Sequence, residues 1–311
     1  PNAWIEAEDG SLVYGSIQPE MRTALAKLQQ LYKDGLIDME FTVRDEEKAG
    51  EAVLREEVGA FLGVQWTHWI AGGGVDLYKN NLESDWRVYP IPSVDDKPVQ
   101  VNAYDNTNEF MVVRKGFKHP EAAVKMLNWI NLMGHGPQPI PYEEWKELWA
   151  NWAYALIKPE SIHANMQRWL NTFAALETGD TSEVEKSHLN LEQYEDIKRF
   201  VEEGQEMRKS DLEEDREWAK VRWGWMLSGE VFKIANQYRE NGQLRVDKIG
   251  AFVSPTMIER QGVLDQLEVE TFTRIITGDA PIDAFDQFVQ EWKNLGGDDI
   301  TKELNEWYKQ K

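Results

Sequence analysis

Residues 87–130 read RVYPIPSVDDKPVQVNAYDNTNEFMVVRKGFKHPEAAVKMLNWI, and this stretch carries three local structural signals. Residues 86–91 are predicted to form an extended strand that prolines terminate, because proline lacks a backbone donor and keeps its predecessor extended. Residues 109–113 are a short apolar run that predicts another strand, ended by Gly116. A helix is expected to begin around Pro120, since proline is favoured in a first helical turn. We therefore predict an α/β body.

Helical patterns dominate the second half of the chain. A long helix is predicted from Pro255, and Gly278 is expected to end it. Nearly all of residues 142–239 has helical character, so the C-terminal half is expected to be helix-rich. Asp298 or Asp299 is expected to cap the last helix.

A third short strand is predicted at 58–62, and Gln65 and Trp66 follow directly after it. Ligands of open α/β sheets bind beyond the carboxyl ends of the strands. Trp66 and Trp69 can therefore contact a ligand. They can also be core residues of the helix that follows, and both interpretations stay open. His68 is expected at the surface or behind the ligand contacts, and a lone histidine is poor evidence for a metal site.

The composition excludes several classes of function. The 311 residues carry a formal net charge of −21, which argues against nucleic acid and anionic membrane surfaces, because both need a basic face. Cysteine is absent, which removes disulfides, thiolate metal sites and thiol nucleophiles. A glycine-rich phosphate loop, HExxH and GxSxG are also missing from the sequence. No catalytic residue, metal site or cofactor is predicted, and the acidic pairs at 95–96 and 298–299 are assigned to turns and helix caps.

Three stretches resemble, in the same order along the chain, the extracellular solute-binding proteins of bacterial ABC importers. They are residues 15–38, 87–130 and 254–308. The similarity is greatest to carbohydrate-binding family 1, the group related to maltose-binding proteins, and in particular to its large lipoprotein branch from Gram-positive bacteria. It covers most of the chain and is weakest between about residues 134 and 217.

The resemblance implies a periplasmic-binding-protein-like fold of type II, maltose-binding-like, with two lobes and a helix-rich C-terminal half. Residues 1–86 are then part of lobe two, residues 87–131 cross over and belong to lobe one, and residues 132–311 form the helical remainder of lobe two and the C-terminal helices. Members of the branch begin with a signal and a long front segment that builds most of lobe one. The chain is therefore expected to be a fragment with an incomplete first lobe, in which residues 87–131 lack sheet partners.

The resemblance also indicates where a ligand would bind. A tryptophan after the strand at 58–62 often stacks on a sugar ring in this family, because sugar faces carry C–H groups that suit a flat aromatic surface. The loop 102–108 borders the cleft from lobe one, and its amides match sugar hydroxyls, although ordinary turn chemistry explains them equally well. Trp223 and Trp225 lie in a segment that approaches the cleft or packs in the core, and Gln261 stands where many relatives have an aromatic platform. The candidate ligand residues are Gln65, Trp66, Trp69, Asn102, Tyr104, Asp105, Asn106, Trp223, Trp225 and Gln261.

Function classes of different kinds remain open at this point. The first is a non-catalytic component that captures an extracellular carbohydrate, expected to be an oligosaccharide, by lobe closure and delivers it to the permease subunits of an ABC transporter. The alternative is a glycosidase-like enzyme that uses carboxylates in the cleft, and a helical interaction domain is a further possibility. The resemblance implies an extracellular location at the outer face of the cell membrane, with an N-terminal lipid anchor that lies outside this chain.

Overall fold

The computed structural model describes residues 2–70, 73–95, 97–103, 111–135, 163–186, 188–250 and 252–311. The chain divides into two compact units, each assembled from separate segments of the sequence. Unit 1 comprises Pro1–Arg44, Gln100–Asn108 and Gln243–Lys311, and unit 2 comprises Asp45–Val99 and Glu109–Gly242. These bounds do not coincide with the three segments expected from the sequence, and the assignment of segments to two lobes stays a prediction.

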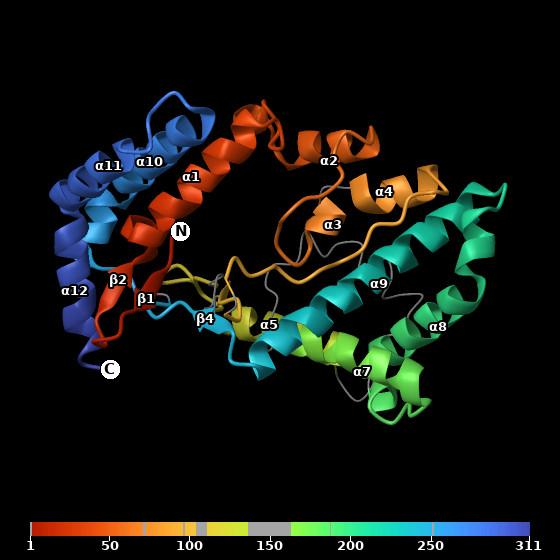
Figure 1. Cartoon of the computed structure of the whole chain (residues 1–311). Coiled ribbons are helices and arrows are strands. Elements are labelled where there is room, and N and C mark those ends of the chain that lie inside the picture. Colours follow the sequence, from red (N-terminus) through yellow and green to blue (C-terminus); the bar gives the residue numbers. More distant parts are fainter. Residues whose placement is uncertain are drawn as a thin grey trace. The chain divides into compact units, whose positions relative to one another are not determined.

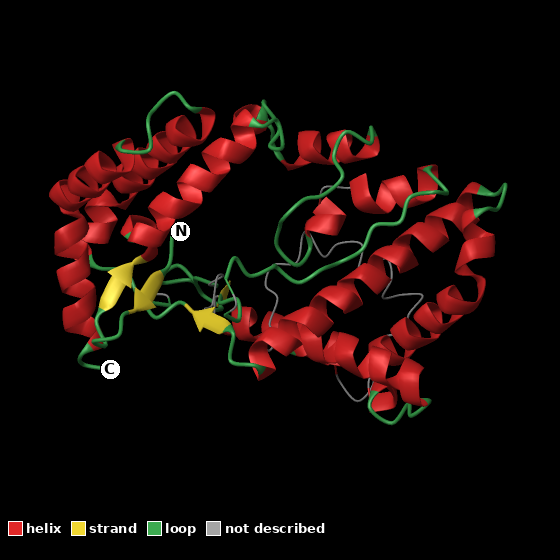
Figure 2. Cartoon of the chain, in the orientation of Figure 1, coloured by secondary structure: helices red, strands yellow, loops and turns green. Residues whose placement is uncertain are grey.

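Unit 1 combines helices with two-stranded sheets (Figures 1 and 2). Its strands are β1 (Trp4–Glu6), β2 (Leu12–Tyr14), β3 (Val101–Ala103) and β4 (Leu244–Val246). Its α-helices are α1 (Pro19–Lys33), α10 (Pro255–Thr277), α11 (Ala284–Trp292) and α12 (Asp298–Tyr308), with shorter helical turns η1 (Gly15–Ile17), η2 (Phe41–Val43) and η5 (Lys293–Gly297). β1 and β2 pair antiparallel, with Trp4 opposite Tyr14, whereas β3 and β4 pair in parallel, with Val101 opposite Leu244.

An aromatic cluster fixes the β1–β2 hairpin against the C-terminal helices of unit 1. The Tyr14 ring stacks on the Trp292 ring, with centroids 4.9 Å apart and planes inclined by 7°, and Trp4 packs beside both rings. The Asn305 side chain of α12 forms two hydrogen bonds with the backbone of β2. Its amide donates to the Leu12 carbonyl at 2.9 Å, and its oxygen accepts from the Leu12 backbone N–H at 2.8 Å. Both backbone groups of Leu12 are therefore satisfied by α12 rather than by a further strand.

The two ends of α10 confirm the prediction made for them. Ser254 is the N-cap and its hydroxyl accepts a backbone N–H of the first turn at 3.3 Å, while Pro255 is the first helical residue. Gly278 ends the helix with φ of 87°, a left-handed conformation that glycine adopts without steric penalty. The cap predicted at Asp298 or Asp299 is wrong. α12 follows the π turn η5 directly, so both acids lie in its first turn, where they face the positive end of the helix dipole.

Unit 2 consists of helices and long loops in its described part (Figure 2). The helices are α2 (Glu46–Leu54), α3 (Thr67–Ile70), α4 (Gly73–Asn80), α5 (Glu121–His135), α7 (Ala164–Thr178), α8 (His188–Arg208) and α9 (Glu213–Glu240), with a short turn η4 (Val184–Lys186). The 28-residue α9 contacts α3, α4, α7 and α8, and it runs beside α8 in Figure 1. α9 is therefore the element around which the described part of unit 2 is packed.

Glycine allows α9 to approach α7 closely. A Cβ atom at Gly229 would lie 1.8 Å from Cε2 of Phe173, so a larger residue would displace that ring. Phe173 belongs to a buried cluster contributed by α7, α8 and α9. Its other buried members are Met166, Trp169, Ile197 and Phe232.

The C-terminal end of α4 is held by two neighbouring helices. The Trp223 ring of α9 stacks on the Tyr78 ring, with centroids 4.4 Å apart and planes inclined by 7°. The Arg208 guanidinium of α8 lies over the same ring, with Cζ 3.6 Å from its centroid. Arg208 also donates from Nε to the Tyr78 carbonyl and from Nη2 to the Asn81 carbonyl, both at 2.6 Å. The last carbonyls of a helix have no partner within it, so a buried cation is well suited to this position.

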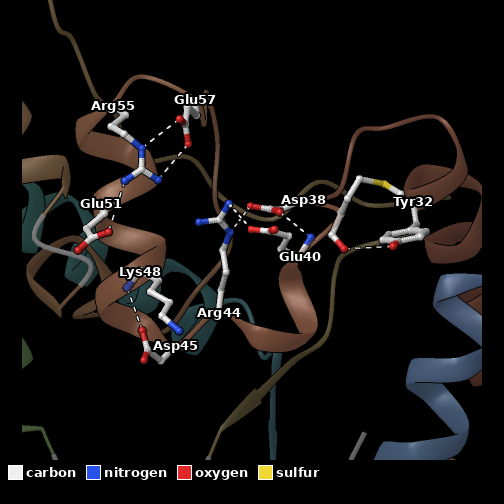
Figure 3. A network of polar contacts seen from close by, with 10 residues as sticks. Tyr32, Asp38, Glu40, Arg44, Asp45, Lys48, Glu51, Arg55 and Glu57 are labelled. Atoms are coloured by element: carbon white, nitrogen blue, oxygen red, sulfur yellow. Dashed lines mark hydrogen bonds and ion pairs between the residues drawn. The ribbon is translucent and has the colours of Figure 1, made fainter.

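The segments before and after α2 carry ion pairs, and a helix cap begins α2 (Figure 3). Arg44 Nε lies 2.5 Å from Asp38 Oδ2, and Arg55 Nε lies 3.0 Å from Glu57 Oε1. The Asp45 side chain begins α2 by accepting a backbone N–H of the first turn at 2.9 Å. Because exposed ion pairs contribute little, the cap at Asp45, worth about 1 kcal/mol, is the larger local contribution to α2.

The strands predicted at 58–62 and 86–91 are wrong, because both segments are loops. Residues 111–113 of the strand predicted at 109–113 are also a loop, and residues 109 and 110 lie outside the described part of the chain. Apolar side chains in these loops are exposed, with Leu62 and Val112 each 87% accessible. An apolar run favours an extended chain, but a strand also needs a neighbour to bond with. Within residues 87–95, 97–103 and 111–131, strand pairing is confined to β3.

The described residues after Ile130 are mainly helical, as predicted. The type II two-lobed fold itself stays a prediction. No helix in the described ranges combines the length and the apolar character needed to cross a membrane.

Replacing Arg208 with methionine is expected to lower the free energy of unfolding by about 2–3 kcal/mol, because buried carbonyls at the end of α4 lose charge-assisted hydrogen bonds. Arg199→Met on the same helix is the matched control, since Arg199 is exposed and pairs with Glu203 at the surface. The control is expected to lose less than about 1 kcal/mol. Urea denaturation of both variants measures the difference, and equal losses would contradict the role assigned to Arg208.

Candidate functional site

Gln65 and Trp66 occupy the central positions of a turn that leads into α3. The Thr67 backbone N–H and the Thr67 hydroxyl both donate to the Val64 carbonyl, at 2.9 and 2.8 Å. Gly63 permits this closure, because a Cβ atom there would lie 2.1 Å from Thr67 Oγ1. Trp66 is 48% exposed. The turn therefore presents a large aromatic side chain to solvent on a backbone fixed by two hydrogen bonds.

Trp69, one turn later, packs against α9 instead. Its indole Nε1 donates to the Ser228 hydroxyl at 2.9 Å. Its ring lies on the Gly224 backbone, where a Cβ atom would be 2.6 Å from the Trp69 ring. Of the two interpretations of Trp69 that the sequence leaves open, this placement corresponds to packing in the helix core.

His68 is buried beside the same hydroxyl, which excludes the surface alternative, and a position behind the ligand contacts stays a prediction. Its Nε2 lies 2.9 Å from Ser228 Oγ and 3.2 Å from the Gly224 carbonyl. Burial lowers the pKa of His68 from 6.5 to about 4, and the hydrogen bond to Gly224 offsets part of this effect. His68 is therefore neutral at neutral pH.

Trp223 and Trp225 point to different sides of α9. Trp223 stacks on Tyr78 in a small buried cluster, as described above. Trp225 packs beside the buried cluster of α7, α8 and α9, and the Arg222 guanidinium lies 5.0 Å from its ring centroid. Both rings are partly buried by neighbouring helices, so both make packing contacts in unit 2.

The remaining candidate residues belong to unit 1 or lie outside the described residues. Asn102 is an exposed residue of β3. Gln261 is a partly buried residue of α10, and its side-chain amide donates to Asp265 Oδ1 at 2.7 Å. Tyr104, Asp105 and Asn106 lie outside the described part of the chain. Gln65, Trp66, Trp69, Trp223 and Trp225 all belong to unit 2, but they have separate surroundings: the turn before α3 carries Gln65 and Trp66, Trp69 packs on α9, and Trp223 and Trp225 lie on different sides of α9.

Sequence reasoning missed Gly224 and Ser228, the two residues that receive α3. They are separated by four positions, so they lie on one face of α9. Small residues at this spacing are a sequence signal for the close approach of another backbone. Here the signal was hidden because the neighbouring tryptophans 223 and 225 drew the interpretation toward a ligand.

Glu268 of α10 is a buried acid with two hydroxyl partners. Its Oε1 accepts from the Ser16 hydroxyl at 2.8 Å, and its Oε2 lies 3.0 Å from the Tyr14 hydroxyl. That hydroxyl also lies 2.9 Å from Asn2 Oδ1, yet it carries one hydrogen. A proton on Glu268 Oε2 would satisfy both contacts, and burial does raise the pKa of Glu268. Its oxygens face hydroxyls of its own core, which does not resemble the open pair of carboxylates that glycosidases use.

Metal coordination finds no support in the described ranges. No group of three or more His, Asp or Glu side chains there is arranged to hold a metal ion. Asp95 accepts hydrogen bonds from Ser93 and from the Lys97 backbone within its own turn, which agrees with the turn role predicted for it.

Comparison with known proteins identifies a distant relative. The chain is 24% identical over 297 residues to an uncharacterized protein encoded in the butB 5′ region of Niallia circulans, an alignment that covers 92% of this chain and 98% of the relative. No protein-family model and no solved structure matches the chain. The relative carries no assigned activity, so the functional interpretation rests on the residues themselves and on the resemblance described above.

Two acids of unit 1 are expected to titrate on opposite sides of the ordinary glutamate pKa of 4.5. Burial raises the pKa of Glu268, whereas hydrogen bonds from Ser254 and then Thr256 lower the pKa of Glu303. Since the folded pKa of Glu268 is the higher one, its contribution to stability is full below pH 4.5 and is lost as pH rises through the folded pKa. Titration of the carboxyl carbons by NMR measures both groups, and a Glu268 value at or below that of Glu303 would contradict this assignment.

Proposed function

We propose that the chain is the non-catalytic solute-binding component of an ABC transporter, and that it captures an extracellular oligosaccharide with Trp66 as the stacking surface. The observation that carries the proposal is the half-exposed Trp66 on a turn whose backbone is fixed. Sugar rings bind to flat aromatic faces through their C–H groups, and a fixed backbone lowers the entropy lost on binding. Gln65 at the neighbouring turn position is exposed and can bond sugar hydroxyls.

The wider assignment rests on the sequence resemblance. It includes a type II, maltose-binding-like fold of two lobes, delivery of the sugar to permease subunits, and attachment to the outer face of the cell membrane through an N-terminal lipid. The same resemblance makes Asn102, Tyr104, Asp105, Asn106 and Gln261 further candidate ligand residues. Trp69 and Trp223 then support the site by packing α3 and α4 on α9, whereas Trp225 packs α9 toward α7 and α8.

A panel of defined oligosaccharides tests binding against catalysis. Each sugar is incubated with the protein, the melting temperature is recorded, and the solution is analysed for new reducing ends. Binding stabilises the folded state by about 2.7 kcal/mol when the ligand is at a hundred times its Kd. The proposal expects a higher melting temperature with at least one sugar and full recovery of intact oligosaccharide. Release of shorter sugars would favour the glycosidase-like enzyme, and the absence of any shift would contradict the proposal.

Trp66→Ala is expected to weaken binding of that oligosaccharide by about 1–3 kcal/mol and to leave the melting temperature nearly unchanged. Trp129→Ala is the matched control, because Trp129 of α5 is also an exposed tryptophan of unit 2, at 56%. The control should leave the affinity unchanged. Calorimetry on both variants measures affinity and stability, and unchanged affinity in Trp66→Ala with a stability loss of about 3–5 kcal/mol would assign Trp66 to the core.

A further inference from the structure

Two side chains of the short helix α3 share one hydroxyl group of α9. Ser228 Oγ accepts from Trp69 Nε1 at 2.9 Å and lies 2.9 Å from His68 Nε2, and it donates to the Gly224 carbonyl at 3.1 Å. With the His68 proton on Nε2, the hydroxyl accepts two hydrogen bonds and donates one, which uses its full capacity. The loss of this hydroxyl would leave both the Trp69 and His68 donors without their shared acceptor.

The same short helix fixes Trp66. The Trp69 backbone N–H donates to the Trp66 carbonyl at 2.9 Å, so the exposed indole and the anchored indole belong to one helical turn. α3 has four residues, too few to be stable through its own hydrogen bonds. The orientation of Trp66 therefore depends on the contacts of His68 and Trp69 with α9.

We propose that Ser228 is a positioning residue of the carbohydrate site: through His68 and Trp69 it fixes the turn that carries Trp66, and protonation of His68 at acidic pH releases this turn and the bound sugar. The sugar half of this inference rests on the function proposed above. The imidazolium form is disfavoured because the ring is buried. A folded pKa of about 4, below the ordinary 6.5, means that the stabilising contribution is full above pH 6.5 and is lost as pH falls toward 4.

Charged groups on the helices packed against α3 have ionic partners of their own. They include Asp76 and Lys79 of α4, Glu217, Lys220 and Arg222 of α9, and Glu51 of α2, and Arg222 pairs with Asp196. Lys220 Nζ lies 2.9 Å from Asp76 and 2.6 Å from Glu217, Lys79 also pairs with Glu217, and Glu51 pairs with Arg55. None of these acids is among the groups that shift the pKa of His68. A proton on His68 therefore gains no compensating ion pair from them.

The first test uses sugar binding. Affinity of the wild type for the oligosaccharide that raises its melting temperature is expected to be constant above about pH 7 and to fall about tenfold or more near pH 4.5. His68→Gln keeps a neutral donor near the Nε2 position and cannot titrate, so its pH profile is expected to be flatter. His119→Gln, a change at an exposed histidine of unit 2, is the control and should keep the wild-type profile. Identical profiles for His68→Gln and the wild type would overturn the proposal.

The second test does not need a sugar. Amide hydrogen exchange is measured at residues 66–69 in the wild type, Ser228→Ala and Ser228→Thr. Protection is expected to fall about tenfold or more in Ser228→Ala and to be restored by the hydroxyl of Ser228→Thr. If the wild type binds no sugar at any pH, the proposed function fails and exchange alone decides on the positioning role. Equal protection in the wild type and Ser228→Ala would overturn that role. An NMR titration that gives His68 a pKa near the ordinary 6.5 would overturn the pH dependence.

Discussion

The packing of unit 2 depends on the enclosure of Tyr78 between the Trp223 ring and the Arg208 guanidinium. Stacking at 4.4 Å on one ring and a cation 3.6 Å from the ring centroid join α4 to α8 and α9 at a single residue. The same guanidinium bonds the carbonyls that α4 leaves open at its end. α3 lies just before α4 in the sequence and contacts both α4 and α9, so the helix that follows the Trp66 turn packs on two of the helices that this enclosure joins.

Residues close together in the middle of α9 contact different neighbouring helices. Trp223 holds α4, Gly224 and Ser228 receive α3, and Trp225 packs toward α7 and α8. Trp223 and Trp225, only two positions apart on α9, therefore both make packing contacts with neighbouring helices. Trp66, on the turn before α3, is half exposed instead. A sugar-binding surface needs one aromatic face left open and a rigid support behind it. In the proposed site the open face is the Trp66 indole on the turn before α3, and α9 supports that turn through His68 and Trp69.

The sequence predicts features that depend on neighbouring residues better than contacts between segments far apart in the chain. The ends of α10 were predictable, because Ser254, Pro255 and Gly278 act through their own backbone neighbours. The strands at 58–62 and 86–91 were not, because an apolar run shows that a chain is extended but not which segment it pairs with. Trp66 was predicted to contact a ligand from its place after an apolar run, but that run is a loop, and the role of Trp66 stays a prediction. Ser228 could not be linked to His68, since the two are 160 positions apart and only packing joins them.

The most direct measurement of the central claim is a crystal structure of the protein with an oligosaccharide that raises its melting temperature. The account predicts a sugar ring stacked on the Trp66 indole, with hydroxyls bonded by neighbouring polar side chains, while Trp69 and His68 remain on Ser228 of α9. A sugar bound elsewhere, with the Trp66 indole still facing solvent, would contradict it.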